Sequence, residues 1–359
     1  MRLADYRGRS LRISRIHPLS RAGIALVLSA LISAANSEAF TDELRFQTSA
    51  VLLATVYHDR SWGAKDTAED GAFSSVNRRW DQTRSGTWYI EQQRAGDQII
   101  ATGLAYHDRV LVDRGLRILE WGFAQQNADG SFPCEDPFHS TSFFVEAATH
   151  SVLLLEAAPE GREFDARVEL LRQKLARTAQ WMTQPGVEQA AKAHNAVFTH
   201  RRFLIGAALG EAGVVLRDQR LVTKSAEYIC DGFLLQMPDE VNREKHGYDS
   251  NYQAVGLVFA MRYYRLVASD ELKQEMYPHL AAGIRWQRSR ITPAGDVLAE
   301  GNTRTAGQER NRDGTAKSVN YSWTVLALAD WATISGDRSF DELASRVWKQ
   351  WEWVKTRKA

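Results

Sequence analysis

The sequence predicts an all-α protein, an α/α toroid of about five to seven helical hairpins. Apolar residues recur at spacings of three and four along most of the chain, and alternating Val/Ile-rich runs, which would indicate strands, are scarce. The helices come in pairs, and the aromatic residue near the end of each second helix recurs at intervals of 52 to 65 residues. A period of this size is typical of stacked helical hairpins.

Five hairpins account for most of the chain. We expect their first helices at 99–112, 143–157, 203–216, 252–267 and 322–334, and their second helices at 114–126, 165–182, 221–236, 271–288 and 340–355. A partial hairpin is expected near 44–57. The first helices are apolar nearly all round, which predicts burial, whereas the second carry one apolar stripe and lie outside. Inner and outer helices that alternate about an axis form a toroid, and an open solenoid is the alternative.

The first 39 residues have the composition of a secretory signal peptide. Six arginines precede the apolar stretch 22–32, which is too short to span a bilayer comfortably, and small residues follow it. We expect a mature chain that begins between Ala35 and Phe40, a single catalytic domain over 40–359, and a periplasmic or secreted location. An uncleaved anchor is the alternative. Nothing after the signal indicates stable membrane insertion.

The charge balance argues against a nucleic-acid partner. Residues 1–39 carry six arginines and two acids, so 39 of the 45 basic and 42 of the 44 acidic residues remain in the mature chain, for a net charge of −3. Such a chain lacks the basic excess that binds nucleic acid. Cys134 and Cys230 can pair in an oxidising compartment or stay free.

Two polar stretches, 193–202 and 246–252, each stand just before an inner helix. Because these helices are successive in the ring, we expect the two stretches to face each other in one site, with helix starts about 8–10 Å apart. The candidate catalytic residues are His194, Asn195, His200, Tyr248 and Tyr252.

Long connections lead from each outer helix to the next inner helix, and a toroid brings such loops to one face. We expect them to supply a substrate-binding set rich in cations and aromatic rings: Trp88, His139, Arg201, His246, Arg304, Lys317 and Tyr321. Arginine binds a carboxylate through two parallel hydrogen bonds, and aromatic rings stack on sugar faces. The set therefore suits an acidic polysaccharide or oligosaccharide.

These residue types suit proton abstraction next to a carboxylate. In a uronic-acid polymer the C5 proton lies α to the carboxylate, and its removal builds negative charge there. A carboxamide, imidazolium or guanidinium stabilises that charge, while Tyr or His takes the proton and delivers one to the leaving oxygen. A Tyr with its ordinary pKa of ~10 needs a cationic neighbour to act as a base.

The His-Asn pair before one inner helix, with a Tyr about one hairpin later, resembles the helical-toroid polysaccharide lyases that cleave alginate or glucuronan. In that group Asn and His neutralise the carboxylate, and Tyr is both acid and base. The resemblance implies that Asn195 with His194 or His200 neutralises, and that Tyr248 or Tyr252 transfers protons. The motif spans only residues 193–252, and its order is His-Asn, whereas the alginate enzymes have Asn-His.

Two other functions compete. A glycoside hydrolase on the same fold needs two carboxylates, for which the loops offer Asp129, Glu135, Asp136, Asp249 and Glu300. A non-catalytic periplasmic glycan-binding protein needs only the aromatic and arginine side chains.

Several candidate residues also have structural interpretations. His194 and Asn195 can cap a helix, as can His139, and His200 and Tyr252 can belong to the core. No metal or cofactor is expected, because the chain has no H-E-x-x-H pattern.

Overall fold

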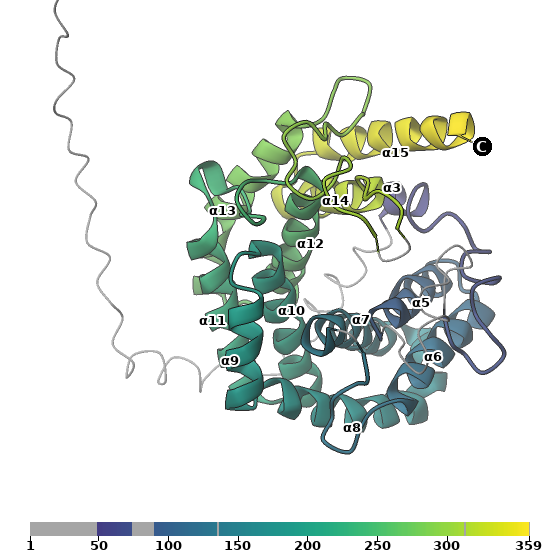
Figure 1. Cartoon of the computed structure of the whole chain (residues 1–359). Helices are drawn as coiled ribbons and strands as arrows, with labels where there is room; N and C mark the ends of the chain where they lie inside the picture. Colours follow the sequence, from purple (N-terminus) through teal and green to yellow (C-terminus); the bar gives the residue numbers. More distant parts are fainter. Residues whose placement is uncertain (1–48, 74–89, 135, 312–313, 359) are drawn as a thin grey trace, which may run out of the picture. The chain divides into compact units, whose positions relative to one another are not determined.

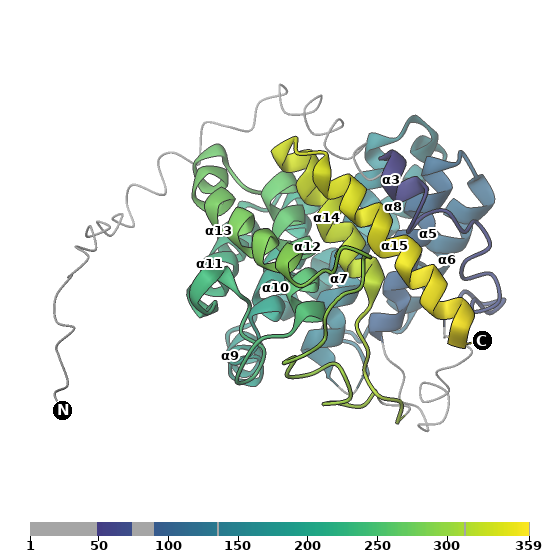
Figure 2. The ribbon, with the colours of Figure 1, turned by 90° about the horizontal axis from the view of Figure 1, so that it is seen from above.

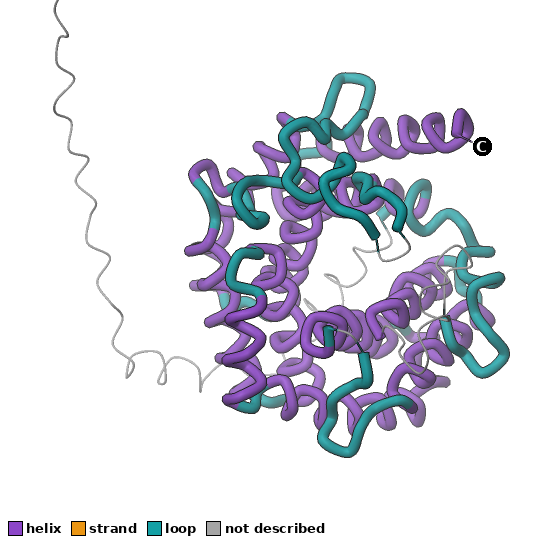
Figure 3. The backbone as a smooth tube through the Cα atoms, in the orientation of Figure 1, coloured by secondary structure: helices purple, strands orange, loops and turns teal. Residues whose placement is uncertain are grey.

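The computed structural model describes residues 49–73, 90–134, 136–311 and 314–358 (Figure 1). In this part of the chain helices are joined by turns and loops, and only isolated β-bridges occur (Figure 3), which confirms the all-α prediction. The chain divides into two compact units, residues 1–40 and 41–359, and all of the described residues belong to the second. The expected signal peptide and its cleavage site lie outside the described residues.

Five hairpins succeed one another along the chain. They are α5 (Ala95–Ala105) with α6 (Arg109–Ala124), α7 (Pro137–Ala157) with α8 (Asp165–Met182), α10 (Thr199–Leu216) with α11 (Gln219–Leu235), α12 (Ser250–Leu266) with α13 (Asp270–Ser289), and α14 (Tyr321–Ser335) with α15 (Ser339–Lys358). The shorter helices are α3 (Ala50–Leu53), η2 (Ile90–Arg94), η3 (Pro159–Phe164), α9 (Pro185–His194) and η4 (Pro238–Glu240).

The first helices of the hairpins pack against one another in chain order, from α5 through α7, α10 and α12 to α14. Each second helix packs on its own first helix, as α15 does on α14 (Figure 2). α7 and α10 are buried on nearly every side, whereas α6 and α11 bury one face. At the two ends of the series, α3 contacts α14 while the Gln98 side chain of α5 donates to Val56 O at 3.0 Å. The segment 50–57 therefore contacts both the first and the last inner helix.

The predicted boundary of the first hairpin is wrong, because the expected helix 99–112 runs across a turn. α5 ends at Ala105 and α6 begins at Arg109. His107 has a left-handed φ of 52°, and the Asp108 carboxylate accepts from two N–H groups of the next helix. Such an aspartate starts a new helix, since it satisfies donors that have no partner within it.

This turn recurs in two other hairpins. Arg217 has a φ of 54° before the capping residue Asp218, and Gly336 has a φ of 75° before Asp337, which accepts from Ser339 N at 2.9 Å. A left-handed residue followed by aspartate is therefore a common way for this chain to reverse direction between an inner and an outer helix.

Two predictions about helix ends are also wrong. The connection 184–202 is partly helical, because Pro185 occupies the first position of α9, where its missing N–H costs nothing. His194 is the last residue of α9 and Asn195 follows it, so neither opens α10. His139 does not cap α7 either, because Asp136 is the cap and accepts from His139 N at 3.4 Å.

A glycine turn precedes three of the hairpins. The turns 127–131 and 292–296 share a backbone N–H to carbonyl bond of 2.9 Å between their end residues, and 68–72 repeats it. In each turn a glycine with φ between 94° and 99° lies against a carbonyl of the following α6, α8 or α15, which leaves no room for a side chain: Gly71, Gly130 and Gly295.

Candidate functional site

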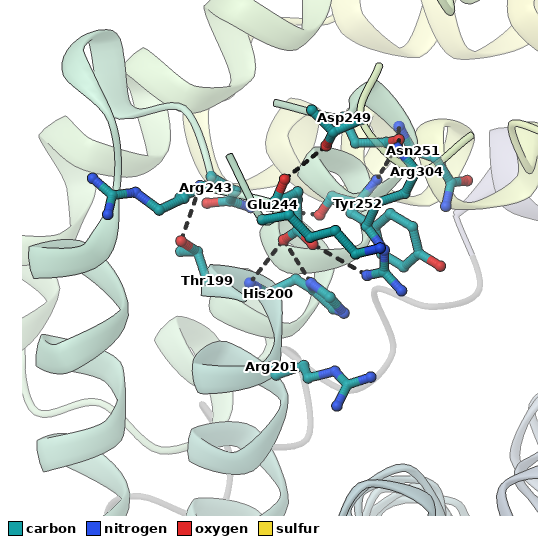
Figure 4. A network of polar contacts seen from close by, with 12 residues as sticks. Thr199, His200, Arg201, Arg243, Glu244, Asp249, Asn251, Tyr252 and Arg304 are labelled. Carbon is teal, nitrogen blue, oxygen red and sulfur yellow. Dashed lines mark hydrogen bonds and ion pairs between the residues drawn. The ribbon is translucent and has the colours of Figure 1, made fainter. Parts of the chain in front are cut away.

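His200 and Tyr252 come from the first turns of two successive inner helices, α10 and α12, and their rings touch. The ring centroids lie 4.6 Å apart and the planes are tilted by 40° (Figure 4). The helices approach closely because Gly256 lies one turn further along α12: a Cβ there would come 3.3 Å from His200 Cα and collide with the Asn242 side chain. His200 is buried and Tyr252 is partly exposed.

Glu244, from the loop before α12, holds the His200 ring. Its Oε1 lies 2.6 Å from Nδ1 and accepts from the His200 backbone N at 3.4 Å, and its Oε2 accepts from Arg304 Nη1 at 3.2 Å. The loop is fixed to the start of α10, since Thr199 N donates to Arg243 O at 3.0 Å. Glu244 is fully buried. Because Nδ1 faces Glu244, Nε2 is the ring nitrogen left for chemistry.

Burial governs the protonation of this pair. Desolvation, together with the positive charges of Arg304, Arg201 and Lys317, lowers the pKa of His200 well below 6.5. Desolvation raises the pKa of Glu244 to about 8, although Arg304 opposes the rise. The imidazole is therefore neutral at pH 7. Ionised Glu244 accepts from Nδ1–H and leaves Nε2 unprotonated, whereas protonated Glu244 donates to Nδ1 and leaves the hydrogen on Nε2.

Arg304 lies over the ring of Tyr252. Its guanidinium carbon is 3.8 Å from the centre of that ring and 4.8 Å from the centre of the Phe198 ring. Arg304 is buried, and its Nη1 donates to Glu244, so one guanidinium contacts both the tyrosine and the carboxylate that holds the histidine. Tyr252 therefore has the cationic neighbour that its use as an acid or base requires.

Glu309 gathers three cations. Arg304 Nε lies 3.3 Å from both of its carboxylate oxygens, Lys317 Nζ donates to Oε2 at 2.5 Å, and Lys245 pairs with Oε1. Desolvation alone would raise the pKa of Glu309, but hydrogen bonds from Lys245 and Lys317 and the charge of Arg304 lower it to about 2. One ionised carboxylate thus compensates only part of the charge of its three partners.

Arg201 follows His200 on α10 and extends from the same end of the helix (Figure 4). Its Nη1 donates to Asn195 Oδ1 and lies 3.5 Å from Asp136 Oδ2. The other end of the Asn195 carboxamide donates to Ala191 O at 2.8 Å. Both polar atoms of this carboxamide are therefore hydrogen-bonded within the protein, and Asn195 positions Arg201. His194 is exposed, with Nε2 3.2 Å from Asp136 Oδ2.

His139, in the first turn of α7, faces these cations from a third helix. Desolvation lowers its pKa well below 6.5, and so do the charges of Arg201, Arg304 and Arg94. The ring is partly exposed. A neutral histidine among arginines indicates a positive potential at the starts of α7, α10 and α12, which favours an anionic ligand.

Two predicted site residues, Tyr248 and Tyr321, have other hydrogen-bond partners. The Tyr248 hydroxyl donates to Glu300 O at 3.2 Å. The Tyr321 hydroxyl lies 3.4 Å from Asp296 Oδ1, and thereby braces the turn 292–296. His246 is exposed and lines a depression of about 640 Å³ with Lys245 and residues 299–303. Trp88 lies outside the described residues.

Glu244 and Glu309 escaped prediction, although they organise the site. Both stand in short polar stretches, 243–245 and 308–310, that are typical of solvated loops. The signal that could have found them is the excess of predicted cations, because buried arginines need carboxylate partners.

Most carboxylates that a hydrolase would need have structural roles. Asp249 is fully buried and caps α12 through Oδ1, while Oδ2 accepts from Arg304 N at 3.0 Å and from Thr305 N at 2.8 Å. Asp129 accepts from Ser131 within a turn, and Glu300 is exposed. Glu135 lies outside the described residues. Asp136, beside Arg201, is the candidate that lies at the site.

Cys134 and Cys230 are both free. Among the described residues, no group of three or more His, Cys, Asp or Glu is placed to hold a metal ion. The same part of the chain contains no helix with the length and apolar character needed to cross a membrane.

Comparisons with known proteins found no family model, no curated protein and no solved structure that matches the chain. Its function is therefore inferred from its own residues and their geometry.

Proposed function

We propose that the protein is a polysaccharide lyase that cleaves a uronic-acid-containing polysaccharide by β-elimination. The observation that carries the proposal is the contact of His200, a neutral imidazole held by a carboxylate, with Tyr252 beneath the guanidinium of Arg304. β-Elimination needs a proton acceptor and a proton donor at the substrate, and positive charge that stabilises the substrate carboxylate. With arginines in this role, the proposed reaction uses no metal and no cofactor.

Each group has a role in this reaction. Arg201 and Arg304 bind the substrate carboxylate and stabilise the charge that develops on it. Nε2 of His200 takes the C5 proton, the C4–O bond breaks as the C4=C5 double bond forms, and Tyr252 gives its proton to the departing glycosidic oxygen. The proton on His200 then returns to Tyr252, directly or through solvent, which restores both groups for the next turnover. Glu244 fixes the histidine, and Asn195 fixes Arg201.

We also propose that the helices of residues 50–358 form an α/α toroid. The contacts of the inner helices in chain order, and the contacts of segment 50–57 with both α14 and α5, support this arrangement. The site residues then lie at one end of the ring, at the N-terminal ends of α7, α10 and α12, where helix dipoles favour a bound anion.

Residues 1–39 combine arginines with an apolar stretch, as secretory signal peptides do. We therefore propose that they direct export and are then removed, which would bring the protein to an extracellular or periplasmic polysaccharide. N-terminal sequencing of exported protein should return a start between Ala35 and Phe40. A return of Met1 would contradict export with cleavage.

The function is tested by incubating the mature protein with alginate, glucuronan and polygalacturonate. A lyase produces new reducing ends together with the ultraviolet absorption of the conjugated double bond. New reducing ends without that absorption would replace the lyase by a hydrolase, with Asp136 as its first candidate acid. Retained binding with neither product would replace it by a glycan-binding protein.

A further inference from the structure

A second group of cationic and aromatic side chains lies next to His139. Arg94, the last residue of η2, has its guanidinium carbon 4.3 Å from the centre of the Phe143 ring and 5.9 Å from the centre of the Trp323 ring. The His139 ring is 5.0 Å from the same Phe143 ring. Phe259 of α12 packs against both Phe143, at 5.8 Å, and Trp323, at 5.5 Å. η2, α7, α12 and α14 thus meet in this group.

The inner members of the group are buried and the outer members are not. Phe143 and Phe259 are buried, whereas Arg94 and Trp323 are partly exposed. Trp323 therefore offers an indole surface that packs on Phe259, and Arg94 adds the positive charge of a guanidinium beside it.

This pairing matches an acidic sugar better than other ligands. A hexuronate residue has an apolar pyranose face that packs on an aromatic ring, and a carboxylate at its edge that binds a guanidinium. A neutral sugar would pack on the indole but would not pair with the guanidinium. A small inorganic anion would pair with the guanidinium but would not pack on the indole.

The group is also close to the proposed reaction site. The His139 ring contacts the Phe143 ring. The charges of Arg201 and Arg304, as well as that of Arg94, lower the pKa of His139. The separations from His139 to Phe143 and from Phe143 to Arg94 are comparable with the width of one pyranose ring. His139 therefore connects the two groups, so that an extended chain bound at His200 and Tyr252 would run toward Arg94.

We propose that Arg94 and Trp323 form a second subsite, which binds the uronate residue adjacent to the one held at His200 and Tyr252. The assignment of the cleaved residue rests on the proposed function, but the subsite itself requires only an acidic sugar chain. Because both subsites carry arginine, the protein selects chains with consecutive acidic sugars over chains in which acidic and neutral sugars alternate.

Calorimetric titration of the mature Tyr252→Phe protein with tetrasaccharides from alginate and from glucuronan tests the subsite, with cellotetraose as the neutral probe. In this background Arg94→Gln should weaken uronide binding at least about tenfold, since a charged hydrogen bond contributes about 1.5–3 kcal/mol. Arg94→Lys should lose less. Trp323→Leu should weaken binding by a similar factor, and Trp323→Phe should retain most of it.

Arg290→Gln is the matched control. Arg290 also lies over two aromatic rings, those of Tyr248 at 5.3 Å and Trp286 at 6.0 Å, but outside this group. It should leave the affinity unchanged, and a thermal melt of every variant checks the fold. Unchanged uronide affinity in folded Arg94→Gln and Trp323→Leu proteins would overturn the subsite, as would binding of cellotetraose as tight as that of the uronides.

The outcomes separate this inference from the proposed function. Loss of uronide binding in Arg94→Gln, in a protein that produces no unsaturated sugar from any polyuronate, would support the subsite and reject the lyase. Lyase activity with an Arg94→Gln affinity equal to that of the parent would reject the subsite and support the lyase. A parent protein that binds none of the uronides would reject both.

Discussion

The inner helices carry two buried groups of charged residues, and their charges are balanced differently. The first is the site at the starts of α10 and α12. The second, which we call the core cluster, consists of Asp97, Glu146, His150, Glu211 and Arg262. In the core cluster Arg262 pairs with Glu146 and lies 3.6 Å from Asp97, and Asp97 Oδ1 lies 2.7 Å from His150 Nδ1.

The core cluster is enclosed and its acids outnumber its cations. Desolvation, with the nearby charge of Glu146, raises the pKa of Glu211 well above 4.5, so that Glu211 keeps its proton and relieves the negative excess. At the site the cations are in excess and Tyr252 reaches solvent. Burial of charge alone therefore does not distinguish the two groups, and our proposal relies instead on the uncompensated positive charge next to the partly exposed Tyr252.

The largest expected effect is on turnover at the site. Tyr252→Phe removes only the hydroxyl, so turnover of polyuronate should fall by about 10²–10⁴-fold, the usual contribution of a positioned acid–base group. The unfolding transition should not move. Tyr248→Phe, whose hydroxyl binds a backbone carbonyl, is the matched control and should keep its activity. Equal activities of the two variants would remove the distinction between these tyrosines.

The next effect is on the stability of the core cluster. Arg262→Met leaves Glu146 and Asp97 without their cation and should lower the free energy of unfolding by about 3–5 kcal/mol, as measured by urea denaturation. Arg220→Met, which breaks an exposed pair with Asp218, should cause no measurable change. A comparable loss in both variants would show that burial does not determine how much these ion pairs contribute to the free energy of unfolding.

The pH dependence of turnover should reveal the Glu244–His200 pair. Nε2 can accept a proton only when Glu244 is ionised, and its pKa is raised to about 8, so turnover should rise about tenfold between pH 7 and pH 9. In Glu244→Gln this rise should disappear, because the side chain no longer titrates. A flat profile for the parent protein over this range would reject His200 as the base.

The smallest effect concerns Glu211. Its pKa in the folded protein is raised, so its contribution to stability is complete below pH 4.5 and is lost as the pH rises toward the folded value. Glu211→Gln mimics the protonated acid, so it should match the parent in stability at about pH 4 and be more stable than the parent near pH 8. Thermal melts at the two pH values measure this difference, and equal melts at both would contradict it.

The helices were more predictable from sequence than the loops between them. α8 was predicted residue for residue, over 165–182, because its apolar residues keep a helical spacing along the whole helix. α9 was missed, since ten residues with one buried side chain leave almost no periodic signal. That helix also displaced His194 and Asn195 from the start of α10, where the sequence alone had placed them.

Part of the site was predictable for a similar reason. His200, Arg201 and Tyr252 stand next to helix starts that the pattern defines, so their proximity followed from the order of the helices. Glu244 reaches His200 across 44 residues through a loop whose path depends on a backbone contact with Thr199. No local sequence pattern encodes a contact of that kind, so the roles of Glu244 and Glu309 could be assigned only from the three-dimensional structure.

The short hairpin turns have a consequence for the order of folding. In four of the five hairpins only two or three residues join the inner and outer helices, at 106–108, 217–218, 267–269 and 336–338. Each pair can form early, because little chain entropy is lost when such a short loop closes. The site instead requires Glu244 to meet His200 and Arg304, which are 44 and 60 residues away. The contacts of His200 with Glu244 and Tyr252 should thus form late, only after the neighbouring hairpins have docked.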